Sequence, residues 1–369
     1  MIIGVDGNEA NVTKRVGVSF YCLNLLYYFK RKSHEKIKFI VYLKNKPLED
    51  LPKENSNFKY RVVPGKFLWS QVFLPLDLLI YRKINIFFSP AHYTPKFCPV
   101  PTVVTIHDLS FLYYPGDFLK KDLYKLVNWT KESIKKVNKI IAVSKTTKKD
   151  IIKEYNIDEN KVEVIYNGYE KDIKILGGTS KFKSVFNKPF ILYVGTLQPR
   201  KNITTLIQSF AMFNKIYPTY ELIIAGKKGW MYKQIFNEVV DFGLDKKVFF
   251  TDYVSDKQLA FLYKNAFCFV LPSLYEGFGI PILEAMSFDC PVISSFSSSL
   301  SEIGGDACLY FDPKNPNDLK EKFIELKEND NLRKDLIIKG KKRVKNFSWK
   351  SCAKQTLDVI IKAYEDKDN

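Results

Sequence analysis

The fold class follows from the stretch FCFVLPSLYEGFGIPILEAM, residues 267–286. The apolar run FCFVLPS ends in a turn with two glycines, and Pro281 stands where the next apolar segment begins. This order predicts a strand, a tight turn and a helix, with Glu276 in the turn and Glu284 in the first helical turns. Such a unit is the building block of sheets with parallel strands.

The same turn is a candidate ligand site. Free backbone amides at a helix N-terminus attract anions and sugar hydroxyls. The amides expected to point out of this helix N-terminus are those of Gly277, Phe278, Gly279 and Ile280. Glu276 and Glu284 beside them suit polyhydroxyl groups, because a carboxylate accepts paired hydrogen bonds from a diol. The alternative is that both glutamates only complement the helix dipole.

Similar units repeat along the whole chain. Short apolar, β-branched runs alternate with amphipathic segments, which predicts an α/β fold of two doubly wound, Rossmann-like domains facing a central cleft. We expect an N-terminal domain over residues 1–170, a linker over 171–189 and a second domain over 190–346. The last segment, 347–369, is expected to form a helix that could cross back onto the first domain.

Length and charge narrow the function classes. A chain of 369 residues is longer than one hydrophobic core usually grows. The net charge of +18 comes mostly from scattered lysines, without an arginine-rich tail, so we do not expect nucleic acid as a partner. Six widely spaced cysteines without a C-x-x-C pair, and no basic-then-apolar leader, favour a cytoplasmic protein with reduced thiols.

Three further motifs carry candidate site residues. In YVGTLQPRKN, Arg200 and Lys201 precede a helix, where two cations and free amides can hold a diphosphate. In TIHDLSF, His107 follows a predicted strand at the cleft edge, and in RVGVSFY, Gly17 lets the backbone approach a phosphate. Each has an ordinary alternative: a solvated basic turn, a structural histidine and a common tight turn.

The motifs together resemble one known family. The second half contains, in this order, VGTLQPRKN, TDYVSDKQLAFLYKNA, PSLYEGFGIPILEAM and SEIGGDACLYFDP. The first half contains IGVDGNEAN, RVGVSFY, TIHDLSF, IAVSKTTKKDI and VEVIYNG. Over almost its whole length the chain therefore resembles the family 4 retaining glycosyltransferases of the GT-B fold.

The resemblance implies a site for a nucleoside diphosphate sugar in the second domain, 190–346, with the N-terminal domain, 1–170, on the acceptor side. Glu276 would contact hydroxyls of the donor sugar, with help from the amides of residues 277–280, and Glu284 would bind the ribose diol. Arg200 and Lys201 would hold the diphosphate.

Further roles are implied outside this turn. The backbone around Tyr253 and Val254 would meet the base, and Gly17 would approach the phosphates. His107 would lie near the sugar and would act with Glu276 as a catalytic residue. Many relatives have a second glycine where this chain has Ser19, so we expect that loop to approach the diphosphate less closely.

The resemblance also implies the reaction. A hexosyl group would move with retention of its anomeric configuration, without a metal or a cofactor, because the nucleoside diphosphate sugar is itself the substrate. GTLQPRKN favours GDP-mannose as the donor, and UDP-sugars stay open. A nucleotide-sugar epimerase or a non-catalytic nucleic-acid binder are the alternatives from other classes.

The expected partners are the donor and a glycan or lipid-linked acceptor in cell-surface polysaccharide synthesis. The basic surface and the apolar segment Phe67–Tyr81 could rest on an anionic membrane leaflet. In this family the position of Asp289 is commonly glycine, so we expect an altered turn there with the chemistry intact. Nothing in the sequence indicates an oligomeric state.

Overall fold

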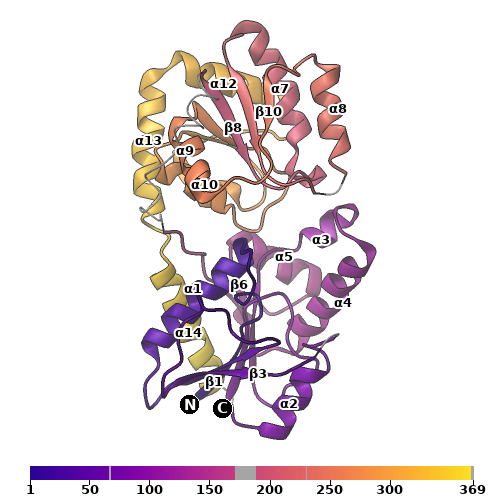
Figure 1. Ribbon diagram of the computed structural model, residues 1–369, viewed down its shortest axis with the longest axis vertical. Coiled ribbons are helices and arrows are strands. Elements are labelled where there is room, and N and C mark those ends of the chain that lie inside the picture. The colour runs from indigo at the N-terminus through magenta and orange to yellow at the C-terminus, as the bar shows by residue number, and fades with distance from the viewer. Residues whose placement is uncertain (66–67, 171–187, 230, 367–369) are drawn as a thin grey trace. The chain divides into compact units, whose positions relative to one another are not determined.

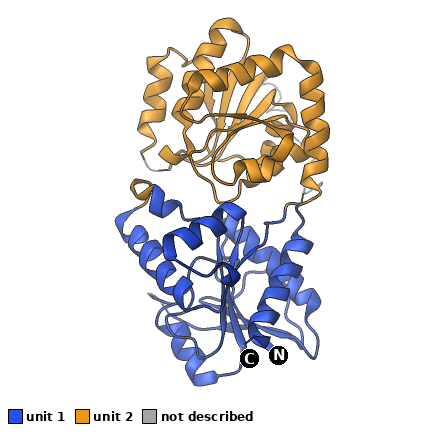
Figure 2. Cartoon of the chain, turned by 180° about the vertical axis from the view of Figure 1, so that it is seen from behind, with its two compact units in different colours: residues 1–113, 119–168, 347–369 blue, residues 114–118, 169–346 orange. Residues whose placement is uncertain are grey.

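The computed structural model describes residues 1–65, 68–170, 188–229 and 231–366 (Figure 1). The chain divides into two compact units (Figure 2). Unit 1 comprises Met1–Tyr113, Leu119–Gly168 and Phe347–Asn369, and unit 2 comprises Tyr114–Phe118 and Tyr169–Asn346. Most of the linker expected over 171–189 lies outside the described residues.

Unit 1 is built on a seven-stranded sheet in the order β3-β2-β1-β4-β5-β6-β7, in which all paired strands are parallel. Its strands are β1 (Ile2–Asp6), β2 (Lys38–Leu43), β3 (Phe58–Val62), β4 (Ile86–Ser89), β5 (Thr102–Ile106), β6 (Lys139–Ala142) and β7 (Val162–Val164). Its helices are α1 (Gly17–Lys32), α2 (Phe73–Tyr81), α3 (Ser110–Tyr113), α4 (Lys120–Lys136), α5 (Lys145–Tyr155), α14 (Trp349–Glu365) and the 3₁₀ turn η2 (Glu159–Lys161).

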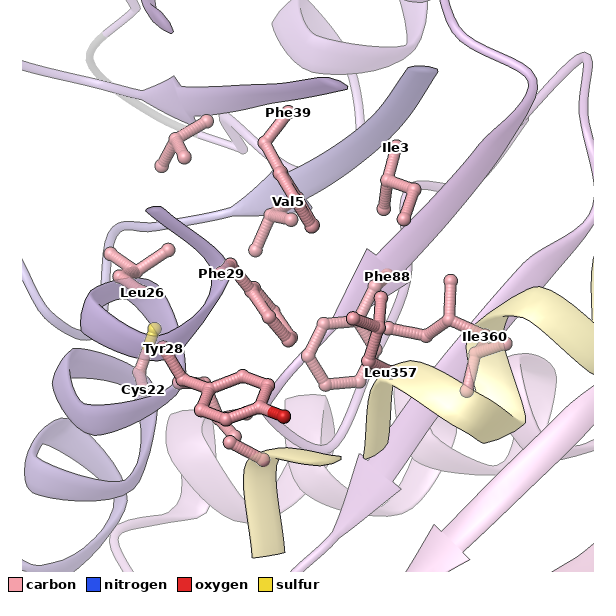
Figure 3. Packing of buried hydrophobic residues seen from close by; sticks show 14 of the residues in the cluster. Ile3, Val5, Cys22, Leu26, Tyr28, Phe29, Phe39, Phe88, Leu357 and Ile360 are labelled. Carbon is pink, nitrogen blue, oxygen red and sulfur yellow. The ribbon is translucent and has the colours of Figure 1, made fainter. Parts of the chain in front are cut away.

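The C-terminal helix α14 belongs to the core of unit 1. Figure 3 shows Leu357 and Ile360 of α14 beside Phe88 of β4, in the same cluster as Phe29 of α1. These four side chains are buried, so α14 covers one face of the sheet together with α1. Burying apolar side chains of this size stabilises the unit by roughly 1.5–3 kcal/mol each.

Unit 2 repeats the design with six strands in the order β10-β9-β8-β11-β12-β13, again with parallel pairs throughout. Its strands are β8 (Phe190–Val194), β9 (Glu221–Ala225), β10 (Val248–Phe250), β11 (Cys268–Leu271), β12 (Val292–Ser295) and β13 (Cys308–Phe311). Its helices are α7 (Ile203–Ile216), α8 (Lys233–Asp241), α9 (Asp256–Asn265), α10 (Ile280–Ser287), α11 (Leu300–Gly304), α12 (Pro316–Glu328) and α13 (Asp330–Val344), with 3₁₀ turns η1 (Pro115–Asp117), η4 (Pro199–Lys201) and η5 (Gly305–Ala307).

The α/β, doubly wound prediction is confirmed for both sheets. Continuous burial along β5, β9 and β11 explains the pattern, since strands covered on both faces read as unbroken apolar runs. In each sheet the chain order reverses once, between β1 and β4 in unit 1 and between β8 and β11 in unit 2. Ligands of such sheets bind at the carboxyl ends of the strands at that reversal.

Two local turns lie in segments that the sequence analysis named. The helix in the apolar segment is α2, which begins only at Phe73, because Leu68 takes a left-handed φ of 53° and the chain turns before the helix starts. Asp289 has φ 62°, in the left-handed region that favours glycine. Its carboxylate lies 3.0 Å from Lys341 Nζ. The turn after α10 therefore keeps a left-handed residue although a side chain is present.

In the described part of the chain, no helix is both long enough and apolar enough to cross a bilayer.

Candidate functional site

The candidate site of unit 2 lies where β8 and β11 meet. These strands are neighbours, so the turn after β8 and the turn after β11 come together at the same edge of the sheet. The first turn contains η4 with Arg200 and Lys201, and the second contains Glu276. A hydrogen bond of 2.9 Å from Leu274 N–H to Arg200 O joins the two turns directly.

Lys201 and Glu276 form the centre of this site. Lys201 Nζ lies 2.5 Å from Glu276 Oε1, although the two residues are 75 positions apart in the chain. Arg200 Nη1 lies 3.6 Å from Glu276 Oε2 and donates to Tyr275 O. Both cations and the carboxylate are largely buried, so their charges act on one another with little screening by water.

Glu276 is held ionised by these neighbours. Burial works to raise the pKa of Glu276, but the charges of Lys201 and Arg200, with hydrogen bonds from Lys201 and Ser273, outweigh it. The net result is a pKa below the usual value for glutamate. Such a carboxylate accepts hydrogen bonds, as sugar hydroxyls would require, and does not serve as a proton donor near neutral pH.

A run of serines after β12 supports the Glu276 turn. Ser298 Oγ accepts from Glu276 N–H at 2.8 Å, and Ser299 Oγ donates to Glu276 O at 2.8 Å and to Phe278 O at 3.0 Å. Ser297 Oγ donates to Ser273 O at 2.7 Å. These bonds set the backbone of the turn, and the sequence patterns that identified Glu276 contained no signal for them.

The glycine turn begins α10 as its sequence predicts. Gly279 is the N-cap of α10 with φ 103°, and no side chain caps the helix. This φ favours glycine, and an added Cβ would lie 2.7 Å from Leu300 Cδ2, so the Leu300 side chain would have to shift. The remaining turn residues named above, Gly277, Phe278 and Ile280, lie directly beside it at the start of the helix.

Glu284 lies on α10 itself and has a different environment. Its Oε2 accepts a hydrogen bond of 2.9 Å from the hydroxyl of the buried Tyr263 on α9. Burial raises the pKa of Glu284, Tyr263 lowers it in part, and the charge of Asp256 adds to the rise. The two glutamates of the opening stretch are therefore pushed in opposite directions, Glu276 toward the charged form and Glu284 toward the neutral form.

The predicted base-binding residues follow β10 at the same sheet edge. Tyr253 is 67% exposed, and Lys227 Nζ lies 5.2 Å from the centre of its ring. Val254 is half-buried. Gly226 N–H donates to Asp252 O at 3.0 Å, which ties this loop to the end of β9.

Asp117 is a site residue that the sequence patterns did not single out. It belongs to the short segment Tyr114–Phe118 that groups with unit 2, and it is buried. Its Oδ2 accepts from Arg200 N–H at 3.1 Å and lies 4.0 Å from Arg200 Nε. The available signal was a lone acidic residue after a Pro-Gly pair, which is too common to identify a contact made 83 positions later.

The remaining predicted residues lie in unit 1. His107 follows β5 and is buried, and its Nε2–H donates to Pro90 O at 2.8 Å, which fixes the tautomer. Burial, then the neighbouring His92 ring, lower the pKa of His107 to about 4, against smaller opposing effects of Pro90 O and Asp108. His107 is therefore a neutral imidazole near neutral pH.

Gly17 is the first residue of α1, whose N-cap residue Val16 provides no side-chain hydrogen bond. A Cβ on Gly17 would meet nothing within 4 Å, so the space above this helix start is open. Ser19, which replaces the second glycine of many relatives, is buried in the first turn.

Among the described residues, no group of three or more His, Cys, Asp or Glu side chains is placed to hold a metal ion.

Comparisons with known proteins identify the family of the chain. The sequence matches the family described as Glycosyltransferase Family 4 over residues 17–172 and the family described as Glycosyl transferases group 1 over residues 179–343. It is 31% identical over 291 residues to the O-antigen chain mannosyltransferase B of Escherichia coli, covering 75% of this chain and 74% of that protein. It is 34% identical over 210 residues to the O-antigen chain mannosyltransferase RfbU of Salmonella typhimurium, covering 57% and 56%.

Solved structures share the fold. The sucrose-phosphate synthase of Thermosynechococcus elongatus superposes with a TM-score of 0.75 at 17% identity, covering 99% of both chains. Anabaena HepE in complex with UDP-glucose gives a TM-score of 0.74 at 16% identity, covering 98% of this chain and 99% of that one. At these identities the likeness concerns the fold alone.

Proposed function

Because the chain belongs to the family 4, group 1 glycosyltransferases of the GT-B fold, we propose that it transfers a hexosyl group from a nucleoside diphosphate sugar with retention. The proposed donor is GDP-mannose: both mannosyltransferases compared above are named for mannosyl transfer, and the motif GTLQPRKN favours GDP as the nucleotide. The proposed acceptor is a glycan or a lipid-linked glycan of a cell-surface polysaccharide.

The contact between Lys201 and Glu276 carries this proposal. One buried region combines two cations for a diphosphate with one ionised carboxylate for sugar hydroxyls, beside the N-terminus of α10, which no side chain caps. When the donor binds, the diphosphate takes the cations and the sugar hydroxyls take the Glu276 oxygens. Glu284 accepts from the ribose diol, and the loop with Tyr253 and Val254 meets the base.

In the proposed reaction the bond between the sugar C1 and the diphosphate oxygen breaks, and a bond from C1 to the acceptor oxygen forms on the same face. The acceptor proton moves to an oxygen of the leaving diphosphate. Arg200, Lys201 and the α10 amides stabilise the charge that grows on that leaving group, so the proposal requires neither a metal nor a cofactor. His107, as a neutral imidazole, orients the sugar.

We further propose peripheral contact with an anionic membrane. Eight large apolar side chains are exposed within residues 68–97: Leu68, Val72, Phe73, Leu76, Leu79, Ile80, Tyr81 and Phe97. The exposed cations Arg82, Lys83 and Lys96 flank them. Apolar side chains with flanking cations suit the boundary between headgroups and acyl chains of an anionic leaflet.

The donor site is tested by pairing two variants with a nucleotide panel. GDP should raise the melting temperature of the wild type more than UDP does, because the proposed site binds GDP more tightly. A ligand at 100 times its Kd adds about 2.7 kcal/mol to the free energy of unfolding. Lys201→Ala should weaken GDP binding about 10-fold or more, as loss of a charge-assisted contact implies. Glu276→Gln should reduce mannosyl transfer from GDP-mannose at least about 100-fold while GDP binding persists.

Lys264→Ala, an exposed lysine on α9, is the matched control and should behave as the wild type. Full transfer by Glu276→Gln, or unchanged GDP affinity in Lys201→Ala, contradicts the assignment. A larger stabilisation by UDP would replace GDP-mannose by a UDP-sugar. NMR of the product reports the anomeric configuration, and an isomerised free sugar would indicate an epimerase.

A further inference from the structure

Unit 2 has a shallow pocket that none of the roles above uses. Its volume is about 340 Å³, which lies within the range of small-molecule sites. The lining residues are Phe296, Tyr310, Phe311, Asp312, Pro313 and Asp318. We propose that this pocket binds a neutral hexose unit of the acceptor glycan, with the Phe296 ring as its platform. This inference rests on the proposed glycosyltransferase reaction.

The pocket borders the donor turn. Phe296 follows β12 and Asp312 follows β13, so both stand at the carboxyl ends of neighbouring parallel strands, the edge that also holds Glu276. Ser297, next to Phe296, donates to Ser273 O in the turn that contains Glu276. A sugar on Phe296 is therefore placed beside the candidate donor site within the same unit.

The Phe296 side chain is exposed to solvent at the pocket. This side chain is 68% exposed, although removing a phenylalanine from water would stabilise the fold by roughly 1.5–3 kcal/mol. Its ring meets Tyr310 edge to face at 5.6 Å, and Phe296 N–H donates to Phe311 O at 2.9 Å, so the ring has a defined orientation. A fixed, exposed aromatic ring suits the apolar face of a hexose.

The two carboxylates supply hydrogen-bond acceptors for hydroxyls. Asp312 Oδ1 accepts from Lys314 N–H at 2.9 Å, and Asp318 Oδ2 accepts from Asp312 N–H at 2.7 Å. The second oxygen of each carboxylate has no partner among the residues that the structure describes. The backbone bonds orient these side chains and leave one acceptor on each for a ligand.

The charge of the pocket identifies the class of ligand. The chain as a whole carries +18, yet the described lining includes two carboxylates and neither Lys nor Arg. A phosphate, a nucleic acid or an anionic lipid would be repelled here. A neutral polyhydroxyl ring, with one apolar face and several hydroxyl donors, matches the aromatic ring and the carboxylates together.

The test uses Phe296→Ala in the full chain, with α-manno-oligosaccharides of one to four units as probes and acceptors. Binding by NMR saturation transfer and kcat/KM for these acceptors should fall about tenfold, as loss of one aromatic contact implies. The KM for GDP-mannose and the stabilisation by GDP should stay unchanged. Phe296→Trp should retain acceptor binding, whereas Phe296→Leu should lose it as Phe296→Ala does.

Phe242→Ala is the matched control, because Phe242 is an exposed phenylalanine of unit 2 that comes before β10, at the amino ends of the strands and away from the pocket. Unchanged acceptor binding in Phe296→Ala, an equal loss in Phe242→Ala, or a loss confined to the donor KM overturns the proposal. So does a wild type that binds none of these oligosaccharides. Failure of the proposed reaction is a separate result, since it would show as absent transfer from every donor while oligosaccharide binding still depends on Phe296.

Discussion

Burial sets the protonation state of His107. Its Nε2–H bonds to a backbone carbonyl, and the ring of His92 lies 5.8 Å away. The folded state therefore holds the pKa at about 4, below the value of about 6.5 expected in an unfolded chain. A neutral histidine can orient a hydroxyl through its ring nitrogens but does not deliver a proton as an imidazolium.

This shift predicts a stability change with pH. Because the folded pKa lies below the unfolded one, the unfolded state binds more protons between about pH 6.5 and about pH 4. The contribution of His107 is present above about pH 6.5 and is lost as pH falls, by an amount on the order of 3 kcal/mol at about pH 4. Urea unfolding at about pH 7 and about pH 4.5 should show that the free energy of unfolding falls less for His107→Gln than for the wild type.

The raised pKa of Asp6 changes the free energy of unfolding with pH in the opposite direction. This contribution cancels when the two proteins are compared. Burial raises the pKa of Asp6 to about 6, so its unfavourable contribution appears as pH rises from about 4 to 6. Since Asp6 is present in both proteins, only their difference reports His107. His34→Gln, at a histidine near the protein surface, should follow the wild type. Equal pH slopes in wild type and His107→Gln would show that burial does not set this pKa.

At the level of secondary structure, the packing of α14 depends on a close approach of two backbone segments at Gly168. The chain after β7 passes α14 at Gly168, where a Cβ would lie 2.2 Å from Trp349 N and 2.4 Å from Trp349 Cα. Backbone atoms cannot rotate away as a flexible side chain can. Gly168 is thus a requirement of the packing of α14 on unit 1.

Gly168→Ala should therefore loosen α14. Moving backbone away from the new methyl group, together with disturbance of Leu357 and Ile360 in the core, should lower the free energy of unfolding by about 3 kcal/mol. Urea denaturation measures this change directly. Gly116→Ala is the control, because a Cβ on Gly116 would meet nothing within 4 Å, and it should change stability by less than about 1 kcal/mol. An unchanged midpoint for Gly168→Ala would mean that the junction can relax at little cost.

For the whole molecule, net charge and the exposed apolar residues of α2 lead to one prediction. Binding to vesicles of anionic phosphatidylglycerol should exceed binding to neutral phosphatidylcholine and should weaken as salt rises, because the attraction is electrostatic. The double variant Leu76→Ser with Ile80→Ser should bind about tenfold less, since these side chains are 52% and 72% exposed and available for burial in lipid.

Ile338→Ser is the matched control for this vesicle experiment, because Ile338 is similarly exposed on α13 of unit 2. Co-sedimentation with vesicles gives the bound fraction for each protein. Equal binding of the double variant and the wild type would remove α2 from the contact. Equal binding to both kinds of vesicle would remove the electrostatic part of the proposal.

Much of the fold was predictable because local patterns carry it. Apolar β-branched runs marked the strands of both sheets, and Pro281 with the two glycines marked the start of α10. The turn before α2 was not predictable, since an apolar run of that length fits a helix throughout. The roles of the predicted site residues stay predictions, while their positions, in the turns after the strands or on the helices that follow, are now known.

The linear order of residues specified the βα units, the position of Glu276 in a turn and that of Glu284 on a helix, because these depend on neighbours a few positions away. Only the tertiary structure decided which residues those side chains contact. Lys201 reaches Glu276 across 75 positions because β8 lies beside β11 at the point where the strand order reverses. Asp117 and the serines after β12 join them through tertiary contacts of the same kind, since strand adjacency, which no local pattern encodes, selects which loops share an edge of the sheet.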